Sequence, residues 1–192
     1  MQQMKSDTHS IVALATRALH RSRGAILTVA ITYSVSVCVG IVLVHTGNEW
    51  AIAHRDRIVS RAQSSPITIA LERNDRLRAA VLDFEGNLYG AIANTLAGLG
   101  VLVPYPIFVY RGWIGGIVSI DSSHASRLAE PKEAMYYLIT LTLQLIPYVL
   151  SGGAGVNMGL AFYRPKSFYQ GEKWLGIPKE AMRDVFRIYL LV

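Results

Sequence analysis

Charge is scarce in this sequence of 192 residues, and cysteine is almost absent. Only 17% of the residues are charged and 52% are hydrophobic, whereas about 25% are charged in an average soluble domain. Three stretches contain no Lys, Arg, Asp or Glu at all: residues 24–48, 86–110 and 134–163. Stretches of this length and apolar character are typical of transmembrane helices. The composition therefore predicts a polytopic membrane protein with an all-α fold.

The single cysteine, Cys38, lies inside the first apolar stretch, so the chain cannot form an internal disulfide. A cysteine in such a place usually acts as a small apolar residue. A cleavable signal peptide is the alternative interpretation of this stretch. However, the stretch starts about two dozen residues from the N-terminus and exceeds the roughly 7–15 apolar residues of a signal peptide, which favours a membrane span.

Common catalytic motifs are also missing. The sequence contains neither His-Glu-x-x-His nor Gly-x-Ser-x-Gly, which excludes the usual zinc metalloprotease site and the nucleophile elbow of α/β-hydrolases. The five histidines are scattered and lack the spacing of metal ligands. We therefore predict that the protein is not an enzyme and has no catalytic residue, metal site or cofactor.

The charges that are present are segregated along the chain. Residues 1–23 carry four basic side chains and one acidic one, and residues 156–187 carry six and three. Residues 47–85 balance six arginines against six acids, and residues 121–133 are slightly acidic. This is the asymmetry of the positive-inside rule, not that of a nucleic-acid-binding surface. We expect a cell-membrane protein with a cytoplasmic N-terminus and no nucleic-acid partner.

The longest weakly charged block, residues 86–120, decides the topology. It holds 35 residues, seven glycines, two prolines and one charge, Arg111. As one helix it would be about 52 Å long, which is too long for a hydrocarbon core of about 30 Å.

Charge parity limits how this block crosses the membrane. If both basic segments are cytoplasmic, the number of spans between them is even, and the spans at 25–46 and 134–155 already make two. The block is then a helical hairpin of two short crossings that turns at Pro104-Tyr105-Pro106, or a re-entrant pair shielded by other helices. Two crossings fit better.

The remaining segments also have helical patterns. Residues 1–24 are typical of a basic amphipathic helix on the inner membrane surface. Residues 47–85 predict a helical extramembrane loop, with one helix at 49–63 and a second starting at Ser65-Pro66. A last helix is expected at 178–192. The whole chain, residues 1–192, is thus predicted to form a single transmembrane bundle of about four to five spans.

Small and polar residues in the spans form the candidate site. Glycines four residues apart let helix backbones approach closely in lipid, which predicts tight packing within one bundle or, alternatively, a hinge or an oligomer face. Asparagine and glutamine in such spans more often bond a neighbouring helix than a substrate. The candidate intramembrane polar or packing site comprises Asn87, Arg111, Gly112, Gly116, Gln144, Gly153, Gly155 and Gly159.

Arg111 has two interpretations. If the turn lies at Pro104–Pro106, Arg111 lies inside the following span, where a charge is costly and usually marks function or a buried pair. If the turn lies nearer to Arg111, the residue marks the cytoplasmic end of a span.

From about residue 84 onward, the order of features resembles the stage II sporulation protein M family of integral membrane proteins. The matching features are Asn87-Leu88, Gly98 and Gly100, Arg111-Gly112, Gly115-Gly116, a helix bearing Gln144, and Ser151-Gly152-Gly153-Ala154-Gly155 followed by Gly159. The family often has Asn-Gly at Arg111-Gly112, and Glu with a preceding His where this chain has Gln144 and Thr140. The resemblance implies a helical bundle of about five spans that anchors partner proteins and is not itself a hydrolase.

Two functions follow as hypotheses. The first is a multi-pass membrane scaffold or anchor that binds and positions partner proteins at the cell envelope. Its expected partners are the lipid bilayer, other envelope or membrane proteins, and a second copy of the chain. The alternative is the membrane subunit of a transporter, with Arg111 in or near the translocation path.

Overall fold

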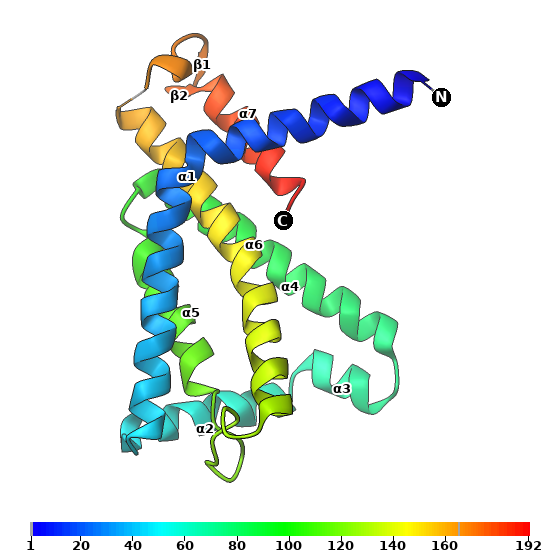
Figure 1. Cartoon of the computed structure of the whole chain (residues 1–192), viewed down its shortest axis with the longest axis vertical. Helices are drawn as coiled ribbons and strands as arrows, with labels where there is room; N and C mark the ends of the chain where they lie inside the picture. The colour runs from blue at the N-terminus through cyan, green and yellow to red at the C-terminus, as the bar shows by residue number, and fades with distance from the viewer. Residues whose placement is uncertain (1, 165) are drawn as a thin grey trace. The chain divides into compact units, whose positions relative to one another are not determined.

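The computed structural model describes residues 2–164 and 166–192, and the side chains from residue 11 onward except those of residues 165 and 168 (Figure 1). This part of the chain is almost entirely α-helical, as the composition predicts. Residue 1 of the helix expected at 1–24 lies outside it. The seven helices are α1 (Gln2–His45), α2 (Glu49–Gln63), α3 (Pro66–Glu72), α4 (Arg76–Ala97), α5 (Pro104–Ile117), α6 (Pro131–Tyr163) and α7 (Lys179–Tyr189). Short 3₁₀ turns η1 (Gly98–Gly100) and η2 (Ser167–Tyr169) and a two-residue hairpin, β1 (Lys173–Trp174) with β2 (Ile177–Pro178), complete the described elements.

The chain divides into two compact units. Unit 1 comprises Met1–Ile31, Ala91–Ile107 and Gln144–Val192, and unit 2 comprises Thr32–Gly90 and Phe108–Leu143. Helices α1, α4, α5 and α6 each contribute residues to both units. The contacts described below all lie within one unit or the other.

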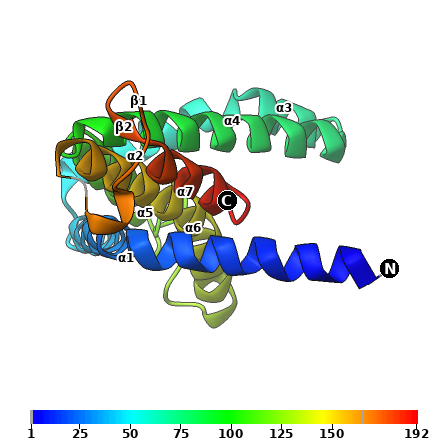
Figure 2. The same ribbon diagram turned by 90° about the horizontal axis from the view of Figure 1, so that it is seen from above.

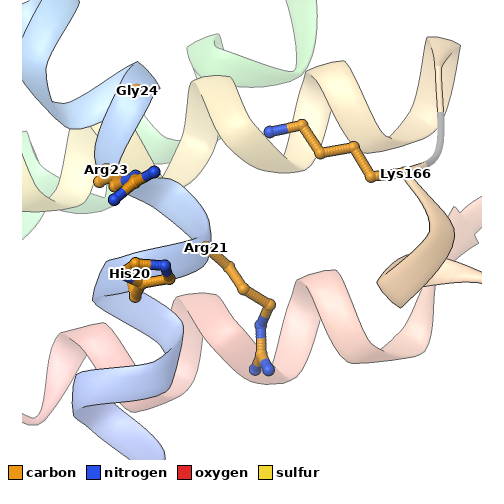
Figure 3. A pocket seen from close by; sticks show the side chains of 5 residues that line it. All are labelled: His20, Arg21, Arg23, Gly24 and Lys166. Carbon is orange, nitrogen blue, oxygen red and sulfur yellow. The ribbon is translucent and has the colours of Figure 1, made fainter.

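Helix α1 is continuous where the sequence predicts a surface helix followed by a span. It changes direction along its length (Figures 1 and 2), and the bend lies near Gly24 (Figure 3). Helices bend at Gly/Ser pairs, and Ser22 and Gly24 supply such a pair here. One face is buried around the bend, at Ala15, Ala18, Ser22, Ala25 and Val29.

Two helices in the described residues are long and apolar enough to cross a membrane. The best windows of α1 and α6 have mean hydropathies of 2.3 and 1.4, and only 28% and 22% of those windows are buried. The core helix of a soluble protein would be mostly buried, so these exposed apolar faces need another cover. The total of four to five spans stays a prediction.

The block at 86–120 breaks in a different place from the one expected. Helix α4 ends at Ala97 and α5 begins at Pro104, so the break occupies residues 98–103, where Val101 has a positive φ of 54°. Proline suits the first position of a helix because its missing N–H would be unpaired there anyway. The prolines therefore start the second helix and do not form the turn. With 14 residues, α5 is about 21 Å long.

Unit 2 contains the helical loop predicted for residues 47–85. Helix α2 covers Glu49–Gln63 as expected and runs across the direction of α1 (Figure 1). Helix α3 begins at Pro66, and the hydroxyl of Ser65 accepts a hydrogen bond from the amide of Thr68 at 3.2 Å. A turn with Asn74 at φ 58° then separates α3 from α4. The second helix predicted for this loop is therefore two helices, and the apolar side chains of Leu77, Val81 and Phe84 belong to α4.

Unit 1 ends in the hairpin and α7. Leu175 and Gly176 both have positive φ, 49° and 83°, which is the backbone of a type I′ hairpin turn. Helix α7 follows at once and lies beside the N-terminal part of α1 (Figure 1). Its buried face comprises Ala181, Asp184, Val185 and Ile188.

Candidate functional site

In unit 2, two of the predicted glycines pack α5 directly against α1. A Cβ added to Gly112 would lie 2.5 Å from the carbonyl oxygen of Tyr33, and one added to Gly116 would lie 2.8 Å from the Cα of Gly40. A Cβ on Gly40 would in turn lie 2.5 Å from the carbonyl oxygen of Trp113. We call Gly40, Gly112 and Gly116 the glycine contact. It is a backbone-to-backbone approach that leaves no room for a side chain.

In unit 1, the other three glycines belong to α6 and contact different elements. A Cβ on Gly153 would lie 2.6 Å from the Cα of Ile26 in α1, and one on Gly155 would lie 2.7 Å from the Cα of Thr95 in α4. A Cβ on Gly159 would lie 2.9 Å from the carbonyl oxygen of Leu99 in η1. These glycines therefore let α6 approach α1, α4 and η1 closely.

The polar members of the predicted site are dispersed. Asn87 in α4 and Arg111 in α5 are partly buried, and Gln144 in α6 is exposed. Arg111 lies well inside α5, not at a turn. Four of the eight predicted residues fall in unit 2 and four in unit 1, and each group is described within its own unit.

An ion-pair network around one buried carboxylate, which the sequence pattern did not reveal, lies in unit 1. Asp184 of α7 is only 1% exposed. Arg21 of α1 donates to both of its oxygens, from Nε to Oδ2 at 2.6 Å and from Nη2 to Oδ1. Arg187 donates to Oδ1 at 3.0 Å, and the hydroxyl of Tyr169 donates to Oδ2 at 2.9 Å. Arg21 and Arg187 also bond Glu180; we call these five residues the Asp184 network.

Two arginines and two carboxylates make this network electrically balanced. Burial, and then the nearby charge of Asp184, raise the pKa of the Tyr169 hydroxyl above its ordinary value. For Glu180, burial would raise the pKa, but the hydrogen bonds from Arg187 and Arg183 and the positive charge of Arg187 together outweigh it, and the pKa lies below its ordinary value. Tyr169 therefore stays a neutral donor and Glu180 stays an anion at neutral pH.

The network continues through uncharged groups into α6. The side-chain amide of Asn157 donates to the hydroxyl oxygens of Tyr169 at 2.7 Å and Ser22 at 3.1 Å, and both Asn157 and Ser22 are buried. A separate buried group joins α4 to α7, where the hydroxyls of Thr95 and Tyr189 lie 2.8 Å apart. Polar side chains thus connect α7 to α1, α4 and α6 within unit 1.

Unit 2 has its own buried arginine, Arg55 of α2. It is 3% exposed and donates to the carbonyl of Ile120 at 3.2 Å and to Asp56 at 2.9 Å. Asp56 lies 3.0 Å from the Nε2 of His124, and the hydrogen bond from Arg55 lowers the pKa of this carboxyl. The hydroxyl of Ser123 donates to Asp121 and not to a histidine. The group therefore holds the loop after α5 against α2 and does not form a nucleophile–base pair.

The side chains of the Asp184 network hold helices together. The two oxygens of Asp184 together accept four hydrogen bonds, so the carboxylate has little capacity left for a substrate proton. Within the residues that the structure describes, no group of three His, Cys, Asp or Glu side chains is arranged to hold a metal ion. The Asp184 network is best described as a polar clamp between the first and last helices.

Sequence reasoning missed Asp184 although one signal was present. Ala181, Val185 and Ile188 recur at helical spacing, and Asp184 falls on the same face. A carboxylate inside an apolar helical face implies a buried partner. Its partner Arg21 lies 163 residues away in the sequence, so the pairing itself could not be read from spacing.

Comparison with protein-family models, with curated proteins and with solved structures gives no match. The resemblance to the stage II sporulation protein M family therefore stays a prediction from the residues quoted above.

Proposed function

We propose that this chain is a multi-pass protein of the cell membrane that acts as a scaffold or anchor for partner proteins. The observation that carries the membrane part is the exposure of the apolar faces of α1 and α6. Leu27, Ile31 and Val35 of α1 are 54–60% exposed, and Leu138, Ile139 and Leu143 of α6 are 50–65% exposed. Acyl chains are the natural cover for such faces.

The chain segments that make up each unit support the proposed topology of four crossings. Unit 1 contains the two basic segments that charge parity assigns to the cytoplasm, residues 1–24 and 156–192, and also the break between α4 and α5, residues 98–103. Unit 2 contains both segments assigned to the outside, residues 47–85 and 121–133. Four crossings would bring residues 98–103 to the same side of the membrane as the two basic segments, which agrees with their grouping in one unit.

The start of α4 supports partner binding. Leu77, Val81 and Phe84 share one face of this helix and are 78%, 48% and 64% exposed. Charged residues surround them at positions 76, 78, 83 and 85, which disfavours burial of this turn in hydrocarbon. We infer that this face binds an apolar helix of another envelope protein, in the manner of helix-in-groove recognition.

Mild solubilisation and co-purification test the scaffold. We expect the wild-type chain to retain a defined partner, and Leu77→Ala with Phe84→Ala to lose it. Leu27→Ala with Val35→Ala is the matched control, because it removes two exposed apolar side chains from α1 and should keep the partner. A wild-type chain that always emerges alone would contradict the proposal, and capture of only a second copy would replace the partner with a homo-oligomer.

One observation favours the transporter alternative. Arg111 lies inside α5, partly buried, and α5 follows a break with positive φ at Val101. Interrupted helices near a charge are typical of transport sites. The test is the rate of uptake by vesicles that contain the reconstituted protein. A rate that falls in both Arg111→Ala and Arg111→Lys would support this role. A rate unchanged in both variants would remove Arg111 from the mechanism.

A further inference from the structure

The hairpin of unit 1 carries two large apolar side chains at its exposed tip. Trp174 is 58% exposed and Leu175 is 76% exposed. Trp174 pairs with Ile177 across the hairpin, so Leu175 and Gly176 form the two-residue turn. The first position of a type I′ turn is usually Asn, Asp or Gly, because its φ is positive. A leucine there at φ 49° is strained, which points to a use for its exposed side chain outside the hairpin itself.

The turn of the hairpin contacts the last turn of α6. A Cβ added to Gly176 would lie 2.6 Å from the Cε2 of Phe162, and the hairpin lies beside the end of α6 (Figure 1). Phe162 and its neighbour Tyr163 are themselves exposed, and their rings pack edge to face at 5.0 Å. We call Phe162, Tyr163, Trp174 and Leu175 the hairpin patch.

The length of α6 gives the depth of this patch in a membrane. The helix has 33 residues and is about 50 Å long, whereas a bilayer with both headgroup layers is about 40–45 Å thick. As a span whose first turn holds Lys132 and Glu133 at one surface, α6 reaches the opposite headgroup layer with its last turn. Tryptophan and tyrosine are enriched in that layer, because their rings are amphipathic. The hairpin patch has the composition expected there.

The charge of the hairpin fits the same surface. Residues 172–179 carry two lysines and one glutamate. Glu172 accepts a hydrogen bond from the Nζ of Lys179 at 2.7 Å, so the charge of the exposed Lys173, next to Trp174, is in excess. Anionic lipids are concentrated in the cytoplasmic leaflet, the side to which this segment is assigned.

We propose that the tip of the hairpin, Trp174 and Leu175, inserts into the headgroup layer of the cytoplasmic leaflet. Side chains of this kind hold a segment at the boundary between headgroups and acyl chains. The strained leucine is then explained, because its side chain is covered by lipid. The inference rests on the membrane part of the proposed function and needs no protein partner.

Quenching of tryptophan fluorescence tests the insertion. The full chain with Trp50→Phe and Trp113→Phe, in which Trp174 is the only tryptophan, is reconstituted in vesicles of phosphatidylcholine and phosphatidylglycerol. The phosphatidylcholine carries bromine either near the headgroup or near the end of its acyl chains, and iodide is added on both sides. We expect stronger quenching by the shallow bromine than by the deep one, and little quenching by iodide. The difference in quenching between wild type and Trp174→Phe gives the same result with Trp50 and Trp113 in place.

Leu175→Asn in the single-tryptophan chain separates insertion from a structural turn. Asparagine adopts a positive φ more readily than leucine, so the hairpin should keep its fold while its tip loses an apolar side chain. The equilibrium between inserted and water-exposed tip should shift about ten-fold toward water, with less quenching by bromine and more by iodide. Leu190→Asn, at an exposed leucine outside the hairpin patch, is the matched control and should leave both unchanged. Unchanged quenching in Leu175→Asn would overturn the proposed role of the leucine.

A tryptophan in α1 distinguishes failure of this inference from failure of the proposed function. Val35→Trp is made in a chain whose three native tryptophans are replaced by phenylalanine, on the apolar face of α1 that we assign to acyl chains. Bromine quenching at position 35, with Trp174 quenched only by iodide, would overturn the insertion and leave the membrane proposal intact. Absence of bromine quenching at both positions would overturn the membrane proposal itself. Protection of Trp174 from both bromine and iodide would show a protein cover and would also overturn lipid insertion.

Discussion

Helix α1 makes two contacts that rest on opposite physical means. In unit 1 it meets α7 through an ion pair, between the partly buried Arg21 and the buried Asp184. In unit 2 it meets α5 through the glycine contact, where backbone atoms would lie within 3 Å of any added Cβ. The first contact depends on every charge having a partner, and the second on the absence of side chains. The two should therefore fail under different substitutions: loss of a charge in one, gain of a methyl group in the other.

The largest effect is expected from Asp184→Ala. The substitution leaves Arg21 without its main partner, and breaking a buried ion pair costs about 3–5 kcal/mol. For a chain of this size the unfolding temperature should fall by about 10 °C. Thermal unfolding in detergent, monitored by circular dichroism, measures this fall in unfolding temperature.

A double substitution sharpens that result. Arg21→Met with Asp184→Leu removes both charges, and Arg187 keeps Glu180 as its partner. Because both charges of the pair are removed together, neither is left without its partner. The double variant should therefore be more stable than Asp184→Ala. Equal destabilisation of the two variants would show that the ion pair is not what holds α7 to α1.

The next effect is expected from Gly116→Ala. The new Cβ would approach the Cα of Gly40 to 2.8 Å, so α1 and α5 must separate, at a cost of about 1–3 kcal/mol. Gly86→Ala is the control, because apart from the adjoining backbone of α4 no described atom lies within 4 Å of a Cβ there. It should stabilise α4 by about 0.5–1 kcal/mol. Thermal unfolding compares the two variants. Equal shifts in unfolding temperature would show that close packing does not explain the glycine at position 116.

A smaller effect is expected from Tyr169→Phe. The ring stays, but Asp184 loses one donor and Asn157 loses one acceptor, which costs about 1–2 kcal/mol. Tyr163→Phe, which alters a tyrosine that is 63% exposed, should change the unfolding temperature little. An unchanged unfolding temperature in Tyr169→Phe would show that only the charged members of the Asp184 network contribute to stability.

The smallest effect is the pH dependence that Glu180 of unit 1 contributes. The folded pKa of Glu180 lies below its ordinary value of 4.5, so its contribution to stability is complete above pH 4.5 and is lost as the pH falls through the folded pKa. The unfolding temperature of wild type should therefore fall more steeply below pH 4.5 than that of Glu180→Gln. Parallel curves would contradict the ion pairs with Arg21 and Arg187.

Local patterns predicted much of this fold, because caps and apolar runs act over a few residues. The bounds of α2, and the Ser65-Pro66 start of α3, follow from such signals. The break at 98–103 was misplaced, because Pro104 is equally compatible with a turn and with the first residue of a helix. Gly40 and Arg21 were missed as contact residues, because their partners Gly116 and Asp184 are brought to them only by the tertiary fold.

The central claim is that the chain crosses the membrane an even number of times between its basic segments. Single cysteines introduced as Ser60→Cys in α2 and Ser167→Cys after α6, both in a Cys38→Ser background, test it by labelling intact cells with a membrane-impermeant maleimide. Serine 60 and serine 167 are both exposed, so accessibility depends on the side of the membrane. We predict that the cysteine at position 60 is labelled in intact cells and that the cysteine at position 167 is labelled only after permeabilisation. Labelling of both from the same side would contradict the topology.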